Sequence, residues 1–169
     1  MIRPITVHPW SMLSLGEELA VNHLVAAASA VWPSANRALY IPFWLPTPIT
    51  AVQMFSYNGA TASGNIDVGI YAEDGTRIVS AGSTAQAGTN ALQAFDITDT
   101  LIGPGRYYLA IAMDNTTGTL FQAAYAARFM AGHGCFTQAS AFPLPAVATF
   151  ATSASSSNVA FGFSTRAVL

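Results

Sequence analysis

The chain has 169 residues, of which 52% are hydrophobic and only 8% are charged, and its net charge is −2 at pH 7. Its six basic residues are all arginines scattered singly along the chain, which excludes the clustered positive charge that nucleic-acid binding requires. Because an ordinary soluble domain has about 25% charged residues, either other protein covers much of this surface or small neutral groups coat it.

The first 31 residues have an irregular apolar pattern, which predicts an N-terminal arm or extension. A short helix over residues 17–30 fits the same stretch, and it either packs on a neighbouring subunit or covers the domain itself. The most apolar run, residues 24–32, is far shorter than the ~20 residues that span a bilayer, so we expect no membrane insertion. Two glutamates precede residues 28–30, which resemble a signal-peptidase site, so we expect no signal peptide and synthesis in the cytoplasm.

Residues 32–169 predict a single all-β domain. Short runs rich in Val, Ile, Phe, Tyr and Thr alternate with Gly, Pro, Asn or Asp, a rhythm typical of β-sandwiches and barrels. We expect a two-sheet antiparallel β-sandwich of jelly-roll type. Beyond the hairpin described next, the predicted strands are 38–44, 50–57, 91–97, 106–113, 119–126, 146–151 and 159–165.

The clearest unit is a β-hairpin formed by residues 65–72 and 76–80. Ile66, Val68 and Ile70 alternate with other residues, so one face of the first strand is predicted to be buried. Asp74 and Gly75 supply the positive-φ residues that a tight hairpin turn needs.

The strand predicted at residues 106–113 has two different faces. Tyr107, Leu109 and Ile111 share one face and are predicted to belong to the core. Tyr108 and Ala110 share the other face, together with Ala112. That face is small and flat, so it suits contact with another sheet or with another subunit.

The sequence contains few residues suited to catalysis or metal binding. His133 and Cys135 are a possible base and thiol, or two zinc ligands, but a structural zinc site needs four ligands and this is the only cysteine. The aspartates after two predicted strands are either calcium ligands or turn caps, and turn capping is the favoured interpretation; they are Asp96, Asp99 and Asp114. We therefore expect a non-enzyme without a metal or cofactor.

Aromatic residues are the best candidates for a binding or assembly surface, because interface cores are enriched in aromatics and poor in charge. Plain core packing is the alternative for each of them. The candidates for interface or glycan contact are Trp10, Trp32, Trp44, Tyr57, Tyr71 and Tyr108.

Three strings carry a resemblance to known proteins. They are residues 36–46 (Asn-Arg-Ala-Leu-Tyr-Ile-Pro-Phe-Trp-Leu-Pro), 67–75 (Asp-Val-Gly-Ile-Tyr-Ala-Glu-Asp-Gly) and 101–110 (Leu-Ile-Gly-Pro-Gly-Arg-Tyr-Tyr-Leu-Ala). They resemble segments of β-sandwich proteins from the structural gene modules of tailed bacteriophages, over residues 32–126. A Pro-Gly-x-Tyr turn into a strand also occurs in bacterial adhesins and carbohydrate-binding sandwiches. The resemblance implies a small sandwich, often homotrimeric, on tail fibres, baseplates or the capsid surface.

We therefore expect a non-enzymatic structural component of a phage virion, made in the host cytoplasm. It would be an oligomeric β-sandwich, most simply a homotrimer, on the exterior of the particle as a capsid decoration or cement protein or as a tail-fibre or baseplate protein. Its partners would be its own copies and other virion proteins. The alternative is a carbohydrate-binding adhesin module for host recognition, in which exposed aromatics and neutral polar residues hold a host surface glycan. The neutral candidates are Asn58, Asn65, Gln86, Asn90 and Gln93.

Overall fold

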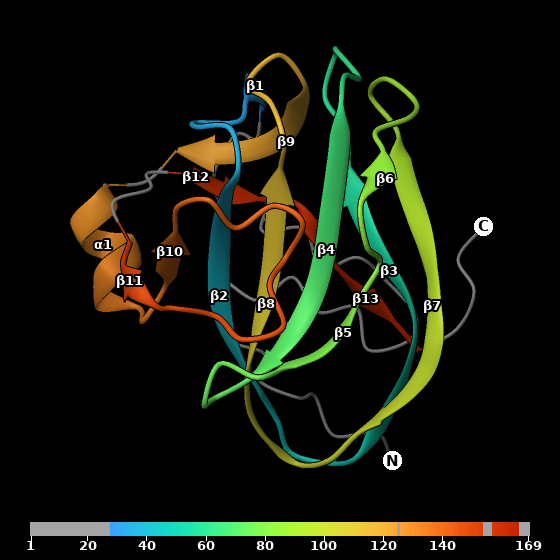
Figure 1. The fold of residues 1–169 in the computed structure, drawn as a ribbon, viewed down its shortest axis with the longest axis vertical. Coiled ribbons are helices and arrows are strands. Elements are labelled where there is room, and N and C mark those ends of the chain that lie inside the picture. The colour runs from blue at the N-terminus through green and yellow to red at the C-terminus, as the bar shows by residue number, and fades with distance from the viewer. Residues whose placement is uncertain (1–27, 125, 154–156, 166–169) are drawn as a thin grey trace.

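The computed structural model describes residues 28–124, 126–153 and 157–165, and almost all of its regular structure is antiparallel β-sheet (Figure 1). The main sheet has the strand order β11-β10-β2-β8-β4-β5, and β6 also pairs with β4. Its strands are β2 (Arg37–Leu45), β4 (Asn65–Ala72), β5 (Arg77–Ser80), β6 (Thr84–Ala85), β8 (Gly105–Met113), β10 (Phe136–Gln138) and β11 (Ala151–Thr152).

Two smaller sheets complete the architecture. The second sheet has the order β13-β3-β7, and the third has the order β1-β9-β12 and lies at the upper end of the molecule in Figure 1. Their strands are β1 (Ala28–Val31), β3 (Ile49–Tyr57), β7 (Leu92–Ile102), β9 (Thr119–Ala124), β12 (Ser157–Val159) and β13 (Phe161–Ser164). A short helix, α1 (Ala127–Gly132), follows β9. No helix among these described residues is both long and apolar enough to cross a bilayer.

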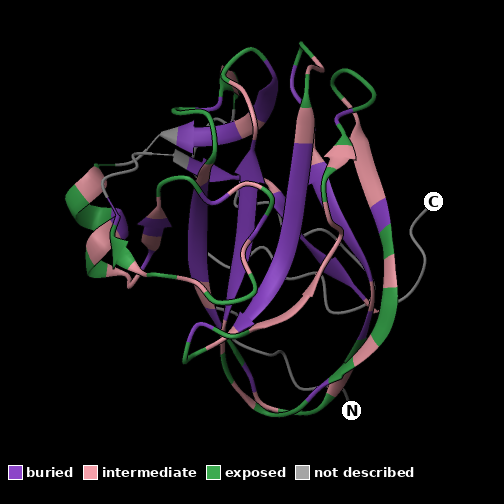
Figure 2. Cartoon of the chain, viewed as in Figure 1, coloured by how far each residue is buried: buried purple, intermediate pink, exposed green. Residues whose placement is uncertain are grey.

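The first core fills the space between the main sheet and the second sheet. Because side chains alternate along a strand, one face of β8 contributes Leu109 and Ile111 to this core. The second sheet contributes Met54 from β3 and Phe163 from β13. These side chains are at most 1% exposed, and the buried strands of the two layers are the purple ribbons in Figure 2.

A second core lies on the opposite face of the main sheet. Residues 139–150, which we call the covering segment, contribute Ala141 and Leu144 to it, and Phe150 packs at its border. In Figure 1 this segment is the orange loop that crosses in front of β2, β8 and β4. The flat face that carries Tyr108 and Ala110 is therefore covered by the chain itself.

The predicted all-β sandwich is confirmed, although the described strands form three sheets instead of the two that were expected. The jelly-roll detail stays a prediction. The hairpin is also confirmed, because β4 and β5 pair through a turn in which Gly75 has a φ of 88°. Asp74 does not share the predicted positive φ; its side chain instead accepts a hydrogen bond from the Thr76 amide. One strand assignment was too long: of residues 146–151 only Ala151 is in a strand. The other residues run as a loop over the sheet, and the apolar side chains of Ala148 and Phe150 that suggested a strand pack against the second core instead.

Both ends of the domain also differ in part from expectation. Residues 28–31 form strand β1, which pairs with β9. The last three residues of the helix predicted over residues 17–30 are therefore in a strand and not in a helix. The remainder of that helix, and most of the arm predicted over residues 1–31, lie outside the described residues. At the other end, β9 stops at residue 124 and α1 follows, although a strand was predicted up to residue 126.

Candidate functional site

The outer face of the main sheet is organised as rows of side chains that run across β2, β8 and β4. Pairing across the strands sets these rows: Tyr40 lies opposite Ala110, and Tyr71 lies opposite Tyr108. Gly69, in the same row as Ala110, leaves room for the covering segment, since a Cβ atom there would lie 3.1 Å from Leu144 Cδ1. The small residues of this face therefore let the covering segment pack closely on the sheet.

Polar contacts hold the covering segment on these rows. The Tyr71 hydroxyl donates to the Pro145 carbonyl at 2.5 Å, and the Leu144 amide donates to Asp67 Oδ2 at 3.0 Å. The Arg77 guanidinium donates to the Leu144 carbonyl. We call these three side chains, Asp67, Tyr71 and Arg77, the polar clamp. Because they come from β4 and β5, the clamp joins the covering segment to one edge of the sheet.

Asp67 is the buried acid of the clamp, with 1% of its surface exposed. Burial raises the pKa of its carboxyl, since the charged form loses its hydration. The Leu144 amide and the Arg77 charge act in the opposite direction, because both stabilise the carboxylate. The net shift is upward, so this group makes the stability of the fold depend on pH.

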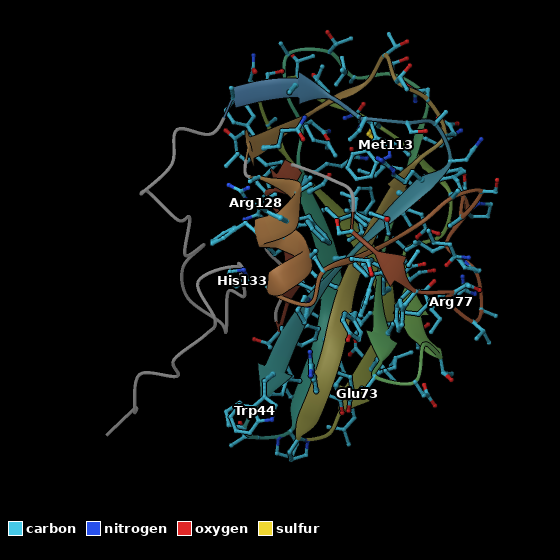
Figure 3. All side chains as sticks on the ribbon, turned by 90° about the vertical axis from the view of Figure 1, so that its left-hand side faces the viewer. Trp44, Glu73, Arg77, Met113, Arg128 and His133 are labelled. Atoms are coloured by element: carbon cyan, nitrogen blue, oxygen red, sulfur yellow. The ribbon has the colours of Figure 1, made fainter. Side chains whose placement is uncertain are left out.

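One row at the end of the outer face remains uncovered. Trp44 lies opposite Arg106 across β2 and β8, and Glu73 follows β4 beside them, with its Oε1 3.7 Å from Arg106 Nη1. Trp44 is 64% exposed, and the side chains of Arg106 and Glu73 are 49% and 65% exposed. We call these three residues the Trp44 row. Figure 3 shows Trp44 and Glu73 at the same end of the sheet.

The Trp44 row borders a shallow depression at an open edge of β2. β10 pairs with β2 only over residues 38–40. Within the described ranges no strand therefore lies beside the later part of β2 on that side, and Pro42 removes one backbone donor there. The depression has a volume of about 190 Å³ and is lined by Pro42, Phe43, Trp44, Arg106 and His133.

A glycine lets the loop after α1 lie against this site. Gly134 has a φ of 77°, which disfavours other residues, and a Cβ atom at this position would lie 3.3 Å from Arg106 Nη2. His133 beside it faces the depression, and its Nδ1 lies 2.8 Å from the Phe129 carbonyl of α1. In Figure 3, His133 lies at the end of α1 and Trp44 lies at the lower end of the sheet, so the two residues line the depression from different sides.

The predicted aromatic candidates do not gather in one place. Trp32 is buried and donates through Nε1 to the Arg37 carbonyl at 3.0 Å. Tyr71 and Tyr108 are buried in the second core. Tyr57 is half-buried, with its ring edge-on to Phe121 at 4.8 Å between centroids.

Of this set, Trp44 is the most exposed of the residues that the structure describes, and Trp10 lies outside the described residues. A contact with a ligand or a second subunit is therefore open to Trp44, whereas the rings of Trp32, Tyr71 and Tyr108 are occupied within the chain.

Most of the neutral residues predicted to hold a glycan are used to tie loops together. Asn58 Nδ2 donates to the Ala87 carbonyl at 2.6 Å and to Gln93 Oε1 at 2.9 Å. Gln86 Nε2 donates to Asn58 Oδ1 at 3.1 Å. Asn65 donates to Asp114 at 2.8 Å. These amides bond with the chain itself, on a different part of the molecule from the Trp44 row.

Sequence reasoning missed Arg106 and Glu73 as site residues. The alternation along residues 106–113 places Arg106 on the same face as Tyr108, so its direction was readable from the sequence. What the sequence lacked was the strand order β2-β8-β4, which brings Trp44 and Glu73 to either side of Arg106.

The other groups considered for chemistry lie apart from this row. Cys135 is buried in the first core, and burial raises the pKa of its thiol to about 11, so the reactive thiolate is scarce at neutral pH. Asp114 accepts hydrogen bonds from the Asn65 amide at 2.9 Å and from its side chain at 2.8 Å. Across the described part of the chain, no three His, Cys, Asp or Glu side chains are grouped closely enough to hold a metal ion.

Comparisons with protein-family models, with curated proteins and with solved structures find no match for this chain.

The polar clamp should contribute measurably to stability. We expect Tyr71→Phe to lower the free energy of unfolding by about 1 kcal/mol, because the Pro145 carbonyl loses its donor. Urea unfolding curves measure this change. Tyr107→Phe is the matched control, since the Tyr107 hydroxyl bonds an exposed carbonyl that water can solvate. Equal effects of the two substitutions would contradict a stabilising role for the clamp.

Asp67 should produce a pH dependence of known sign. Its raised pKa means that the folded protein favours the protonated acid. The contribution of Asp67 to the free energy of unfolding is therefore complete below the ordinary pKa of 3.8 and is lost as the pH rises through the raised pKa. Asp67→Asn cannot ionise. We expect its free energy of unfolding, relative to that of the wild type, to increase from acidic to neutral pH in urea titrations. A difference that stays constant with pH would refute this expectation.

Proposed function

We propose that this chain is a non-enzymatic binding protein that recognises a glycan through the Trp44 row. The observation that carries this proposal is the 64% exposure of Trp44, in line with Arg106 and Glu73 on a sheet face that the covering segment otherwise shields. A large apolar ring exposed beside convergent polar groups is a typical feature of a binding surface.

The chemistry of the three side chains suits a sugar. The Trp44 ring offers an apolar surface for the C–H groups of a sugar ring, while Arg106 donates hydrogen bonds and Glu73 accepts them. Adjacent strands lie about 4.8 Å apart, so a row over three strands extends for about 10 Å. This length suits a short oligosaccharide better than a single sugar ring.

The resemblance to tailed-phage structural proteins supports a setting for this activity. In that setting the chain stands on the exterior of a phage head or tail and contacts a glycan of the host surface. The strings that carry the resemblance include Trp44, Glu73 and Arg106, so the same segments supply the row.

Assembly into an oligomer is a second candidate function, and the described surface favours it. Apart from a few single charges, most exposed residues are Ala, Ser, Thr, Gly, Pro or Asn. The exposed large apolar side chains are Val31, Trp44, Leu101, Phe129 and Val147. Such a surface has little charge repulsion to keep copies apart. The two functions are compatible, because an oligomer presents several Trp44 rows and gains avidity for a repeating glycan.

The glycan proposal is tested on a broad glycan array with the full chain. We expect binding by the wild-type protein and a loss of about tenfold or more in affinity, equivalent to about 1.4 kcal/mol, for Trp44→Ala. Leu101→Ala is the matched control, because Leu101 is also exposed, at 72%, but lies on β7. Silence of the wild type across the array, or equal losses in both variants, would contradict the proposal.

Oligomer formation is measured by light scattering coupled to size exclusion. We expect a mass of at least three times 17.7 kDa. We propose residues 1–27 as part of the assembly arm, so their deletion should lower this mass, and an unchanged mass would refute the arm. The deletion leaves β1 and its pairing with β9 in place, so circular dichroism should stay that of a β-sandwich. A monomeric wild type would rule out self-assembly and leave the glycan proposal standing.

A further inference from the structure

We infer that the Trp44 row selects neutral glycans over acidic ones, and that Glu73 is the residue that sets this selectivity. The inference rests on the proposed glycan-binding function and names the class of ligand. It follows from how the charges of the row are placed on the sheet.

Glu73 neutralises the cation of the row. Its Oε1 lies 3.7 Å from Arg106 Nη1, and both side chains are about half-exposed. An exposed ion pair of this kind adds little to the stability of the fold. Its main effect is that the negative charge of Glu73 offsets the positive charge of Arg106. With Glu73 present, Arg106 acts as a donor of hydrogen bonds whose positive charge is already balanced.

A second acid adds negative charge next to the row. Asp74 follows Glu73 in the β4–β5 turn, and its Oδ1 accepts a hydrogen bond from the Thr76 amide at 2.9 Å. That bond lowers the pKa of the Asp74 carboxyl, so the group is ionised at neutral pH. Arg77, the next cation along the chain, donates to the Leu144 carbonyl under the covering segment.

An acidic sugar therefore gains little from the Arg106 charge, because the two acids oppose it. Its carboxylate would have to approach Arg106 and would then stand within a few ångströms of Glu73. Two like charges about 4 Å apart repel each other enough to weaken binding by about fivefold even at the dielectric constant of water. A neutral sugar has no such conflict, because its hydroxyl groups can donate to Glu73 and accept from Arg106 at the same time.

Glu73→Gln tests this selectivity, because the substitution keeps the shape of the side chain and removes its charge. The probes are neutral hexose and N-acetylhexosamine oligomers, and matched oligomers that contain uronic or sialic acids. We expect the wild type to bind neutral probes, and Glu73→Gln to gain about fivefold or more in affinity for the acidic ones, with a gain that shrinks as salt is added. Asp99→Asn, at an exposed position of β7, makes the same change in net charge elsewhere and should have no such effect.

The outcomes separate the inference from the function on which it rests. A wild type that prefers acidic probes, with Trp44→Ala abolishing the binding, would overturn the selectivity and leave the glycan site in place. Unchanged binding of acidic probes by Glu73→Gln would overturn the role of Glu73. Binding to no probe at all would overturn the glycan function itself. Thermal unfolding of each variant confirms that a change in binding does not come from loss of the fold.

Discussion

The fold depends on one constraint: strand β8 has apolar side chains on both faces, and both faces must be shielded from water. Leu109 and Ile111 need the second sheet, whereas Tyr108 and Ala110 need a cover on the other side. The chain supplies that second cover from its own residues 139–150, which pack Leu144 and Phe150 onto the sheet. The free energy gained by removing apolar side chains from water is roughly proportional to the area buried. A sheet of this composition would therefore be unstable if either cover were removed.

The length of sheet that the covering segment shields determines which side chains of the outer face are exposed to solvent. On β2 and β8 the apolar side chains of the covering segment pack on the row of Tyr108. On the β4 side the segment reaches the β4–β5 turn, where the Ala148 amide donates to the Gly75 carbonyl at 2.8 Å. The next row, which includes Trp44 and Arg106, is therefore left in solvent. The residues best suited to recognition are exposed where the internal shielding stops.

Local patterns predicted much of the fold. The turn at Gly75 and the apolar faces of β4 and β8 depend on neighbours in the sequence, and both are confirmed. The alternation in β4 does not separate a buried from an exposed face, because the covering segment buries the second face as well. The covering segment was misread, because residues 146–151 carry apolar side chains at a spacing that also fits a strand. Helix α1 was missed, since six residues are too short for a clear helical period.

The sequence by itself determined the all-β class, the hairpin and the two different faces of the strand at residues 106–113, because alternation and turn chemistry are local properties. Only the tertiary structure decided which aromatics are exposed and which residues meet. Trp32 and Trp44 look alike in the sequence, yet the first is 2% exposed and the second 64%. The physical reason is that burial and the Glu73–Arg106 contact depend on strand order and on a segment far away in the chain, which no local pattern encodes.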